Sequence, residues 1–410
     1  MKIALVSLEY PYADIPYGGI GTYVKMVSEA LVRHGHYVEL FCGSRVESAS
    51  VDITDRLRLN KVFLEDRQIN RFCDRVLDPF TARHAAVDFD VVEGAEYNHD
   101  TSVIKQKFPD VPLVIKLHSP SYILAEFNRP HGSLLPLTSR ARRLLGEIRT
   151  AVDRRRRPHE VFKHDPEYQL ARAADLVCSP SQILVDRVRK DWGLPRVALL
   201  PNVYTPSTEI LGIEPGPSGQ ARPMISFIGT LHHRKGVEIF LRVIPRVVRR
   251  RPDAIFRFVG KDLHNATYGA TVREYFQRRL PGYVDHCEFT GSVALDRIPG
   301  YLAETDVCVF PALWDNFPYV CLEAMSAGKA VIASSNSGMA EVIRNGENGF
   351  LVRPRDAEAI ARLILQIIGG EVDARSMGRA ARHTIVEEYG DGRVVPAVVQ
   401  AYEGATRTRA

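Results

Sequence analysis

The sequence lacks the patterns that mark a metal-binding, disulfide-bonded or membrane-spanning protein. Its six cysteines are scattered over 410 residues and form no C-x-x-C pair. Most of them lie in apolar runs, which favours reduced, buried thiols over a disulfide framework or a zinc site. No apolar run reaches the roughly 18 residues that a membrane-spanning helix needs. Residues 1–6 have the pattern of a first strand rather than a signal peptide, so a cytoplasmic location is expected.

Two further motifs are missing or misplaced, and each argues against a class of site. No G-x-G-x-x-G sequence follows an expected strand, which disfavours a nucleotide-dependent dehydrogenase. One Asp-x-Asp triplet, Asp88-Phe89-Asp90, has the form of a metal-binding motif. It precedes an expected strand and therefore falls at that strand's amino end, whereas ligands bind at the carboxyl ends. We expect no metal site and no cofactor.

The charge is mildly positive, with one concentrated basic segment. The net charge of +5 allows anionic partners without implying nucleic acid. Between Arg140 and Arg157, arginines outnumber the two acidic residues, Glu147 and Asp153. Two interpretations stay open: a solvated helix face, or a surface that contacts an anionic membrane or acceptor. Nucleic acid is disfavoured because no aromatic residues are interleaved with the arginines.

Short apolar runs alternate with helical patterns along the whole chain. This alternation predicts α/β domains with mostly parallel sheets that are covered on both faces. Ligands bind at the carboxyl ends of such strands, so two domains of this kind, facing each other, would form a cleft. Strands are expected at residues 2–7, 37–42, 91–93, 112–118, 175–179, 198–201, 224–229, 255–259, 288–290, 307–310, 330–333 and 349–352.

A change in composition separates the two halves of the chain. Residues 206–223 are rich in proline, glycine and serine, which predicts a linker. We therefore expect a Rossmann-like domain at residues 1–205 and a second one at residues 224–385. Residues 386–410 are expected to form a C-terminal helix that crosses back to the first domain.

Two glycine-containing loops follow expected strands and precede expected helices. The first contains Gly18 and Gly19, whose small size lets backbone N–H groups approach a phosphate at a helix N-terminus. The second, residues 229–236, contains Arg234 and Lys235. Lys235 is a compact charge suited to a diphosphate, and Arg234 adds a fork of donors. The alternatives are a structural loop for the first and a solvated basic turn for the second.

The most specific segment is 311–328, which follows the strand expected at 307–310. Asp315 lies in its loop, and Glu323 lies eight residues further on, in the next helix. Carboxylates suit hydroxyl groups because they accept two donors at once. The start of the helix, at Tyr319, offers backbone N–H groups to a phosphate. One segment can thus hold a sugar hydroxyl, a diphosphate and a ribose. Spacing alone also fits an ordinary loop and helix with two solvated acids.

This segment resembles the E-x7-E motif of the retaining glycosyltransferases of family four. Members of that family have the GT-B fold, in which two Rossmann-like, doubly wound domains face each other. Other stretches match the family's order over nearly the whole chain. They are Gly18-Gly19, Lys116-Leu117-His118-Ser119, Ser179-Pro180-Ser181-Gln182, Pro201-Asn202, residues 229–236, Glu323-Ala324-Met325 and residues 337–349.

The resemblance implies a role for each matching residue. Glu323 would bind the donor ribose, and Asp315 would hold hydroxyl groups of the donor sugar. Lys235 would neutralise the diphosphate leaving group. His118 would face the sugar from the first domain, although a satisfied histidine at a strand end is the plainer interpretation. The Gly18-Gly19 loop would close over the phosphates. Together with these residues, the expected donor contacts are Thr230, Arg234, Asn316, Phe317, Tyr319 and Val320.

Four positions depart from the family pattern. Asp315 stands in place of a glutamate and is one methylene shorter. Thr230 stands where the family commonly has an arginine, a charge that Arg234 could supply. Asn202-Val203 replaces the usual Asn-Gly pair. Pro318, where the family often has glycine, removes one backbone donor.

The resemblance implies a hexosyltransferase that uses a nucleotide-diphosphate sugar as co-substrate and retains the anomeric configuration. Lys235, with Arg234, would stabilise the departing phosphate charge in place of a metal. The donor sugar, the base and the acceptor stay open, and the acceptor could be a sugar, a polysaccharide, a lipid-linked molecule or a small molecule. Two alternatives remain: a nucleotide-sugar epimerase or phosphorylase of the same architecture, and a non-catalytic nucleotide-sugar-binding protein.

Overall fold

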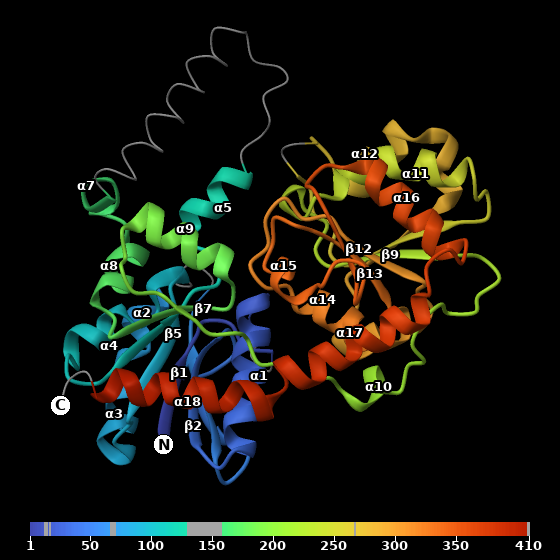
Figure 1. The fold of residues 1–410 in the computed structure, drawn as a ribbon. Coiled ribbons are helices and arrows are strands. Elements are labelled where there is room, and N and C mark those ends of the chain that lie inside the picture. The colour runs from blue at the N-terminus through green and yellow to red at the C-terminus, as the bar shows by residue number, and fades with distance from the viewer. Residues whose placement is uncertain (12–14, 16–17, 66–70, 129–157, 266–267, 408–410) are drawn as a thin grey trace, which may run out of the picture. The chain divides into compact units, whose positions relative to one another are not determined.

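The computed structural model describes the chain except for residues 12–14, 16–17, 66–70, 129–157, 266–267 and 408–410 (Figure 1). The segment from Arg140 to Arg157 therefore lies outside the described residues. The chain divides into two compact units. The N-terminal unit contains the described residues of 1–123, 132–205 and 389–410, and the C-terminal unit contains those of 124–131 and 206–388.

An eight-stranded sheet forms the centre of the N-terminal unit. Its strand order is β3-β4-β2-β1-β5-β6-β7-β8, and among the described residues β3 alone pairs antiparallel. The inner strands are apolar runs buried on both faces, as a parallel sheet between helices requires. The strands are β1 (Lys2–Val6), β2 (Tyr37–Ser44), β3 (Ala49–Asp52), β4 (Leu57–Phe63), β5 (Val91–Ala95), β6 (Leu113–Lys116), β7 (Leu176–Ser179) and β8 (Ala198–Leu199).

Helices follow most of these strands and cover the sheet. In the first of them, α1 (Gly19–Arg33), the buried positions Tyr23, Val27 and Leu31 recur every four residues, so one face of the helix packs on the sheet. The helix stops at His34 and Gly35, where a positive φ of 85° turns the chain back toward β2. The others are α2 (Phe72–Arg75), α3 (Leu77–Val87), α4 (Ser102–Lys107), α7 (Pro158–Phe162), α8 (Pro166–Ala173) and α9 (Gln182–Trp192). Helix α5 (Ser121–Asn128) begins in this unit, and its residues from 124 onward belong to the C-terminal unit.

The C-terminal helix α18 (Asp391–Arg407) is part of the N-terminal unit, although it follows the whole of the second unit in sequence. The hydroxyl of Tyr402 donates to the buried carboxylate of Glu93 on β5 at 2.7 Å. At its other end, Asp391 pairs with Arg33 of α1 at 2.8 Å. Val394, Val395 and Val398 of α18 are buried, which explains why the helix needs a partner surface.

A six-stranded sheet with the order β11-β10-β9-β12-β13-β14 forms the centre of the C-terminal unit. All six strands predicted for this half of the sequence are present, and every pairing between them in the described residues is parallel. The strands are β9 (Met224–Ile228), β10 (Ile255–Val259), β11 (Cys287–Gly291), β12 (Val307–Phe310), β13 (Ala330–Ser334) and β14 (Phe350–Val352).

Helices cover both faces of this second sheet. Figure 1 shows α11, α12 and α16 on one side of the sheet and α14 and α17 on the other. Buried side chains of α11 and α16, such as Val243, Ile244 and Ile364, complete the core against Phe256 and Phe258 of β10. The helices are α10 (Thr208–Leu211), α11 (Phe240–Val248), α12 (Val272–Arg279), α13 (Ile298–Ala303), α14 (Tyr319–Ser326), α15 (Met339–Val342), α16 (Ala357–Ile368) and α17 (Ala374–Tyr389).

Candidate active site

Three loops meet at the carboxyl edge of the second sheet, after the neighbouring strands β9, β12 and β13. The N–H of Leu313 donates to the carbonyl of Arg234 at 2.8 Å, which joins the loop after β12 to the loop after β9. The N–H of Gly338 donates to the carbonyl of Asp315 at 3.0 Å, which joins the loop after β13. The side chain of Asn336 adds a bond to the carbonyl of Leu313 at 2.7 Å. The backbone at this edge is therefore held in one arrangement.

Gly236 allows the first two loops to lie this close. It has a φ of +74°, and a Cβ atom built there would lie 2.0 Å from the carbonyl oxygen of Pro311. No side chain fits at that distance, so glycine is required both for the backbone angle and for the contact. Its place in the turn sets the position of Lys235, which precedes it in the short 3-10 helix η3 (His233–Lys235).

The structure brings the predicted residues Lys235 and Asp315 together as an ion pair. The Lys235 ammonium donates to one carboxylate oxygen of Asp315. The guanidinium of Arg234 lies 3.9 Å from the other oxygen and donates to the carbonyl of Trp314 at 3.1 Å. Burial lowers the pKa of Lys235, and the Asp315 carboxylate opposes that shift. Two cations and one carboxylate thus share a partly buried site with a net positive charge.

Glu323 has a different environment from Asp315. It lies on α14, the helix that begins directly after the β12 loop, and its side chain is partly buried. Among the described residues, its carboxylate makes no hydrogen bond or ion pair with the protein. Burial raises the pKa of Glu323 to about 7. A desolvated carboxylate without a protein partner is suited to accept hydroxyl groups of a ligand.

The other donor contacts predicted in this unit lie on the same loops. Asn316 and Phe317 are buried in the turn before α14, and Tyr319 and Val320 form its first turn. No side chain caps this helix at Pro318. Thr230 follows β9 and is exposed. Their contacts with a donor stay a prediction.

In the N-terminal unit, the predicted Gly18-Gly19 loop leads into α1, and a carboxylate already lies at the start of that helix. One oxygen of Glu9 accepts the N–H of Gly18 at 2.6 Å and that of Gly21 at 3.4 Å. Burial raises the pKa of Glu9, and these two hydrogen bonds oppose the shift. The N–H groups at the start of α1 therefore do bind an anion, but in this structure the anion is a side chain of the protein itself.

His118 lies just beyond β6, and the residue is partly exposed. The ring packs edge-on against Tyr23, with 5.1 Å between centroids, and makes no hydrogen bond with the described residues. Burial, followed by the charge of Lys116, lowers the pKa of His118 to about 3. The imidazole is therefore neutral near pH 7 and can both donate and accept a hydrogen bond.

Sequence reasoning missed the residue that holds His118 in place. The carboxylate of Glu96, fully buried after β5, accepts the backbone N–H of His118 at 2.9 Å and that of Ser119 at 2.7 Å. Burial raises the pKa of Glu96 to about 8. A second carboxylate, Glu167, accepts the N–H of Ser121 at 2.8 Å. An acidic residue at the end of an apolar strand is the signal that could have found Glu96.

The remaining sequence-based expectations concern metals, thiols and membranes. In Asp88-Phe89-Asp90, Asp88 is exposed and directly follows the last residue of α3. The carboxylate of Asp90 accepts the N–H of Lys2 at 2.7 Å. No group of three or more potential metal ligands was found in the described part of the chain. All six cysteines are free thiols. Within the same residues, no helix has the length and apolar composition needed to cross a membrane.

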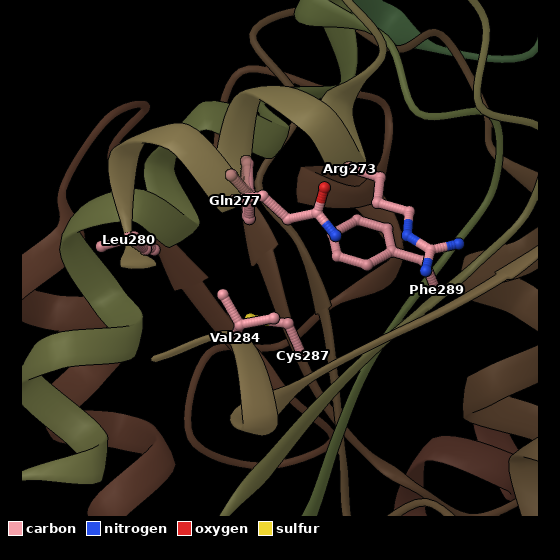
Figure 2. A pocket seen from close by; sticks show the side chains of 7 residues that line it. Arg273, Gln277, Leu280, Val284, Cys287 and Phe289 are labelled. Carbon is pink, nitrogen blue, oxygen red and sulfur yellow. The ribbon is translucent and has the colours of Figure 1, made fainter. Parts of the chain in front are cut away.

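A small cavity lies away from the three loops, at the β11 edge of the second sheet (Figure 2). It has a volume of about 70 Å³. That is well below the roughly 300–1,000 Å³ of typical ligand sites, so the cavity does not compete with the three loops as a substrate site. Its lining comes from α12, the 3-10 helix η5 (Pro281–His286) and β11: Arg273, Phe276, Gln277, Leu280, Val284, Cys287 and Phe289.

Comparisons with known proteins agree with the fold. The model for glycosyltransferase family 4 matches residues 17–207, and the model for glycosyl transferases group 1 matches residues 222–369. The protein is thus a glycosyltransferase with the GT-B fold. More specifically, the chain belongs to glycosyltransferase family four.

Individual relatives match the chain from end to end. Glycogen synthase of Mycobacterium tuberculosis is 24% identical over 432 residues, which cover 99% of this chain and 95% of the relative. The structure of a sucrose-phosphate synthase from Thermosynechococcus elongatus superimposes with a TM-score of 0.74 at 20% identity, with 99% of each chain covered. The catalytic domain of starch synthase IV from Arabidopsis thaliana gives a TM-score of 0.69 at 13% identity, again with 99% of each chain covered. At these identities the structural matches establish the fold alone.

Proposed function

We propose that this enzyme transfers a hexose-type sugar from a nucleotide-diphosphate sugar to an acceptor, with retention of configuration and without a divalent metal. One observation carries the proposal: the loops after β9 and β12 bring Lys235 and Arg234 to the Asp315 carboxylate, beside the helix that bears Glu323. The names of the relatives fit this proposal. One is a glycogen synthase, and the starch synthase structure is bound to ADP and acarbose.

The charges at the sheet edge fit a diphosphate leaving group. When the bond between the sugar and the diphosphate breaks, negative charge develops on phosphate oxygens, and fixed cations stabilise it. Lys235 is the group we assign to this task, with Arg234 as the second cation. In the free protein Lys235 is neutralised by Asp315. Donor binding would exchange that partner: the sugar hydroxyls donate to Asp315, and the ammonium turns to the diphosphate.

The other predicted residues complete the assignment. Glu323 accepts the two ribose hydroxyls, for which its carboxylate has no competing protein donor in the described residues. The neutral imidazole of His118 contacts the donor sugar. For the transfer itself, we propose that the acceptor hydroxyl attacks from the face that the diphosphate leaves and passes its proton to the departing phosphate. This route needs no carboxylate nucleophile and no metal-bound water.

The test is a transfer assay with a panel of nucleotide sugars in the presence of EDTA, together with thermal shift by the matching nucleoside diphosphates. We expect one nucleotide to raise the melting temperature, because it binds only the folded state. We expect Lys235→Ala to lower turnover by about 100-fold or more, the scale seen when one stabilising donor is removed. The matched control is Arg279→Ala, an exposed cation on α12 without an ion pair in the described residues.

Three results would reject parts of this proposal separately. Full activity of Lys235→Ala would remove the assigned role of the lysine. Loss of wild-type turnover in EDTA, restored by added magnesium or manganese, would show that the enzyme needs a metal. A product with inverted anomeric configuration, detected from the coupling constant of the anomeric proton in the NMR spectrum, would exclude the proposed route.

A further inference from the structure

A basic groove runs between α11 and α16 on the C-terminal unit, the two helices that lie together on one side of the sheet in Figure 1. Its volume is about 590 Å³. Four arginines and one acidic residue line it, so its net charge is strongly positive. The lining residues are Arg246, Arg249, Arg250, Glu358, Ala361, Arg362 and Leu365.

The position of these arginines follows from the packing of α11. Its apolar side chains, Val243, Ile244 and Val247 among them, are buried in the core, so the polar positions form a stripe on the opposite face. The side chain of Arg246 donates to the carbonyl of Arg242 at 2.6 Å, and that of Arg249 donates to the carbonyl of Pro245 at 3.1 Å. These bonds use backbone oxygens, and neither guanidinium makes an ion pair with another residue that the structure describes.

Two nearby arginines of the unit have acidic partners. Arg251 pairs with Asp253 at 3.1 Å, and Arg257 pairs with both Glu288 and Glu304 at 2.8 and 2.6 Å. In contrast, none of the four groove arginines makes an ion pair with another described residue. Gathering uncompensated like charges raises the free energy of the folded protein, and a bound anion would offset that cost.

We propose that this groove is a binding site for a small molecule that carries two or more phosphate groups. Guanidinium groups bind phosphate oxygens through parallel hydrogen bonds, and four of them can bind more than one phosphate. The volume of about 590 Å³ lies within the range of small-molecule sites. This site shares no residue with the loops after β9, β12 and β13, and the proposal does not rest on the proposed transferase reaction.

The lining argues against larger anionic partners. A membrane-binding surface combines basic residues with exposed apolar side chains that insert between the lipids. Among the described residues, none of the large exposed apolar side chains lies on α11 or α16. A single-stranded nucleic acid needs aromatic side chains for base stacking, and none lines the groove. A compact polyphosphate satisfies the charge without either feature.

The test measures binding of inorganic pyrophosphate and of a hexose bisphosphate by isothermal titration calorimetry. Lys235→Ala is the background for every sample, because it removes one of the two cations assigned to the diphosphate in the other site and so weakens binding there. The groove variant is Arg246→Gln/Arg250→Gln. The control variant is Arg279→Gln/Arg297→Gln, two exposed arginines of the same unit that lie outside the groove. Both variants remove two positive charges, so they alter the net charge equally.

We expect the background protein and the control variant to bind at least one probe with equal affinity. The groove variant should bind that probe at least about tenfold more weakly. Added salt should weaken the binding, as for any exposed ionic site. Equal affinity of the groove and control variants would overturn the proposal, as would no binding of either probe to the background protein. Groove-dependent sedimentation with phosphatidylglycerol vesicles, without binding of the small probes, would assign the surface to a membrane instead. Matching melting temperatures of the two variants would confirm that both are folded.

Discussion

Glu323 is a residue of the candidate site whose charge state depends on the pH of an assay. Its pKa of about 7 means that near neutral pH a large part of the free protein carries the protonated acid. The protonated form can accept fewer hydrogen bonds than the carboxylate, so ribose hydroxyls should bind preferentially to the ionised form. Nucleotide binding then requires loss of a proton, which weakens binding below the pKa.

We therefore expect the affinity for a nucleoside diphosphate to rise by about tenfold between pH 6 and pH 8, the change in the ionised fraction of a group with a pKa near 7. The terminal phosphate titrates near pH 6 and contributes its own pH dependence. Glu323→Gln separates the two effects, because it keeps the side-chain shape and removes the titration. Titration calorimetry of both proteins over this range is the measurement. Parallel pH profiles in the two proteins would contradict the role given to Glu323.

Acidic residues that belong to a sequence motif were predicted, and acidic residues whose role depends on tertiary contacts were missed. Asp315 and Glu323 lie eight residues apart in one loop and helix, so their common location could be inferred from the sequence. Glu9 binds the start of α1 across 9 positions, and Glu96 binds the backbone of His118 across 22 positions. No local pattern states which N–H groups a distant carboxylate will reach.

At the scale of elements, the strands expected from the sequence are present, including the edge strands β8, β11 and β14, whereas the neighbouring strands β3 and β4 were missed. The inner strands are continuous apolar runs, which a sheet buried on both faces demands. In contrast, β3 is largely exposed and pairs only with β4, and no strand was expected in that stretch. An exposed edge strand has little apolar signal, because its place in the sheet is decided by the pairing with its neighbour.

The turn between β9 and α11 is the element on which the candidate site depends most. We expect Gly236→Ala to destabilise the protein more than Gly346→Ala, although both positions have a positive φ, of 74° and 84°. A Cβ atom at residue 346 meets nothing within 4 Å, so it adds only backbone strain of about 1 kcal/mol. At Gly236 it would also collide with the carbonyl of Pro311. The loss there should exceed about 2 kcal/mol.

Urea unfolding monitored by circular dichroism compares the two variants. Turnover provides a second readout. In Gly236→Ala, displacement of the turn would move Lys235 and lower turnover, whereas Gly346→Ala should leave turnover unchanged. If the two variants lose equal stability and keep equal turnover, the contact between the turn and Pro311 has no special role.

At the scale of the whole molecule, the last helix of the chain completes the first unit. The hydrogen bond between Tyr402 and Glu93 joins residues 309 positions apart. Glu93 also accepts the hydroxyl of Tyr23 at 2.8 Å, so a single buried carboxylate connects α18, β5 and α1. Burial raises the pKa of Glu93, and the two tyrosine hydroxyls oppose that shift. Loss of one hydroxyl would leave a buried acid with a single donor from these helices.

We expect Tyr402→Phe to loosen α18 selectively. Removing one partner from a buried carboxylate costs about 1–3 kcal/mol, and the helix must first detach before its amides can exchange with solvent. Hydrogen exchange measured by mass spectrometry should therefore become faster in α18, while α16, in the core of the other unit, serves as an internal reference. Glu93→Gln and the double variant complete a cycle that isolates the pairwise contribution.

Unchanged exchange in α18 would mean that the apolar contacts of Val394, Val395 and Val398 hold the helix without this bond. Faster exchange in both helices would indicate global destabilisation, which would equally contradict a local anchor. Selective loss of protection in α18 would show that the buried tyrosine–glutamate pair connects the end of the chain to its first unit.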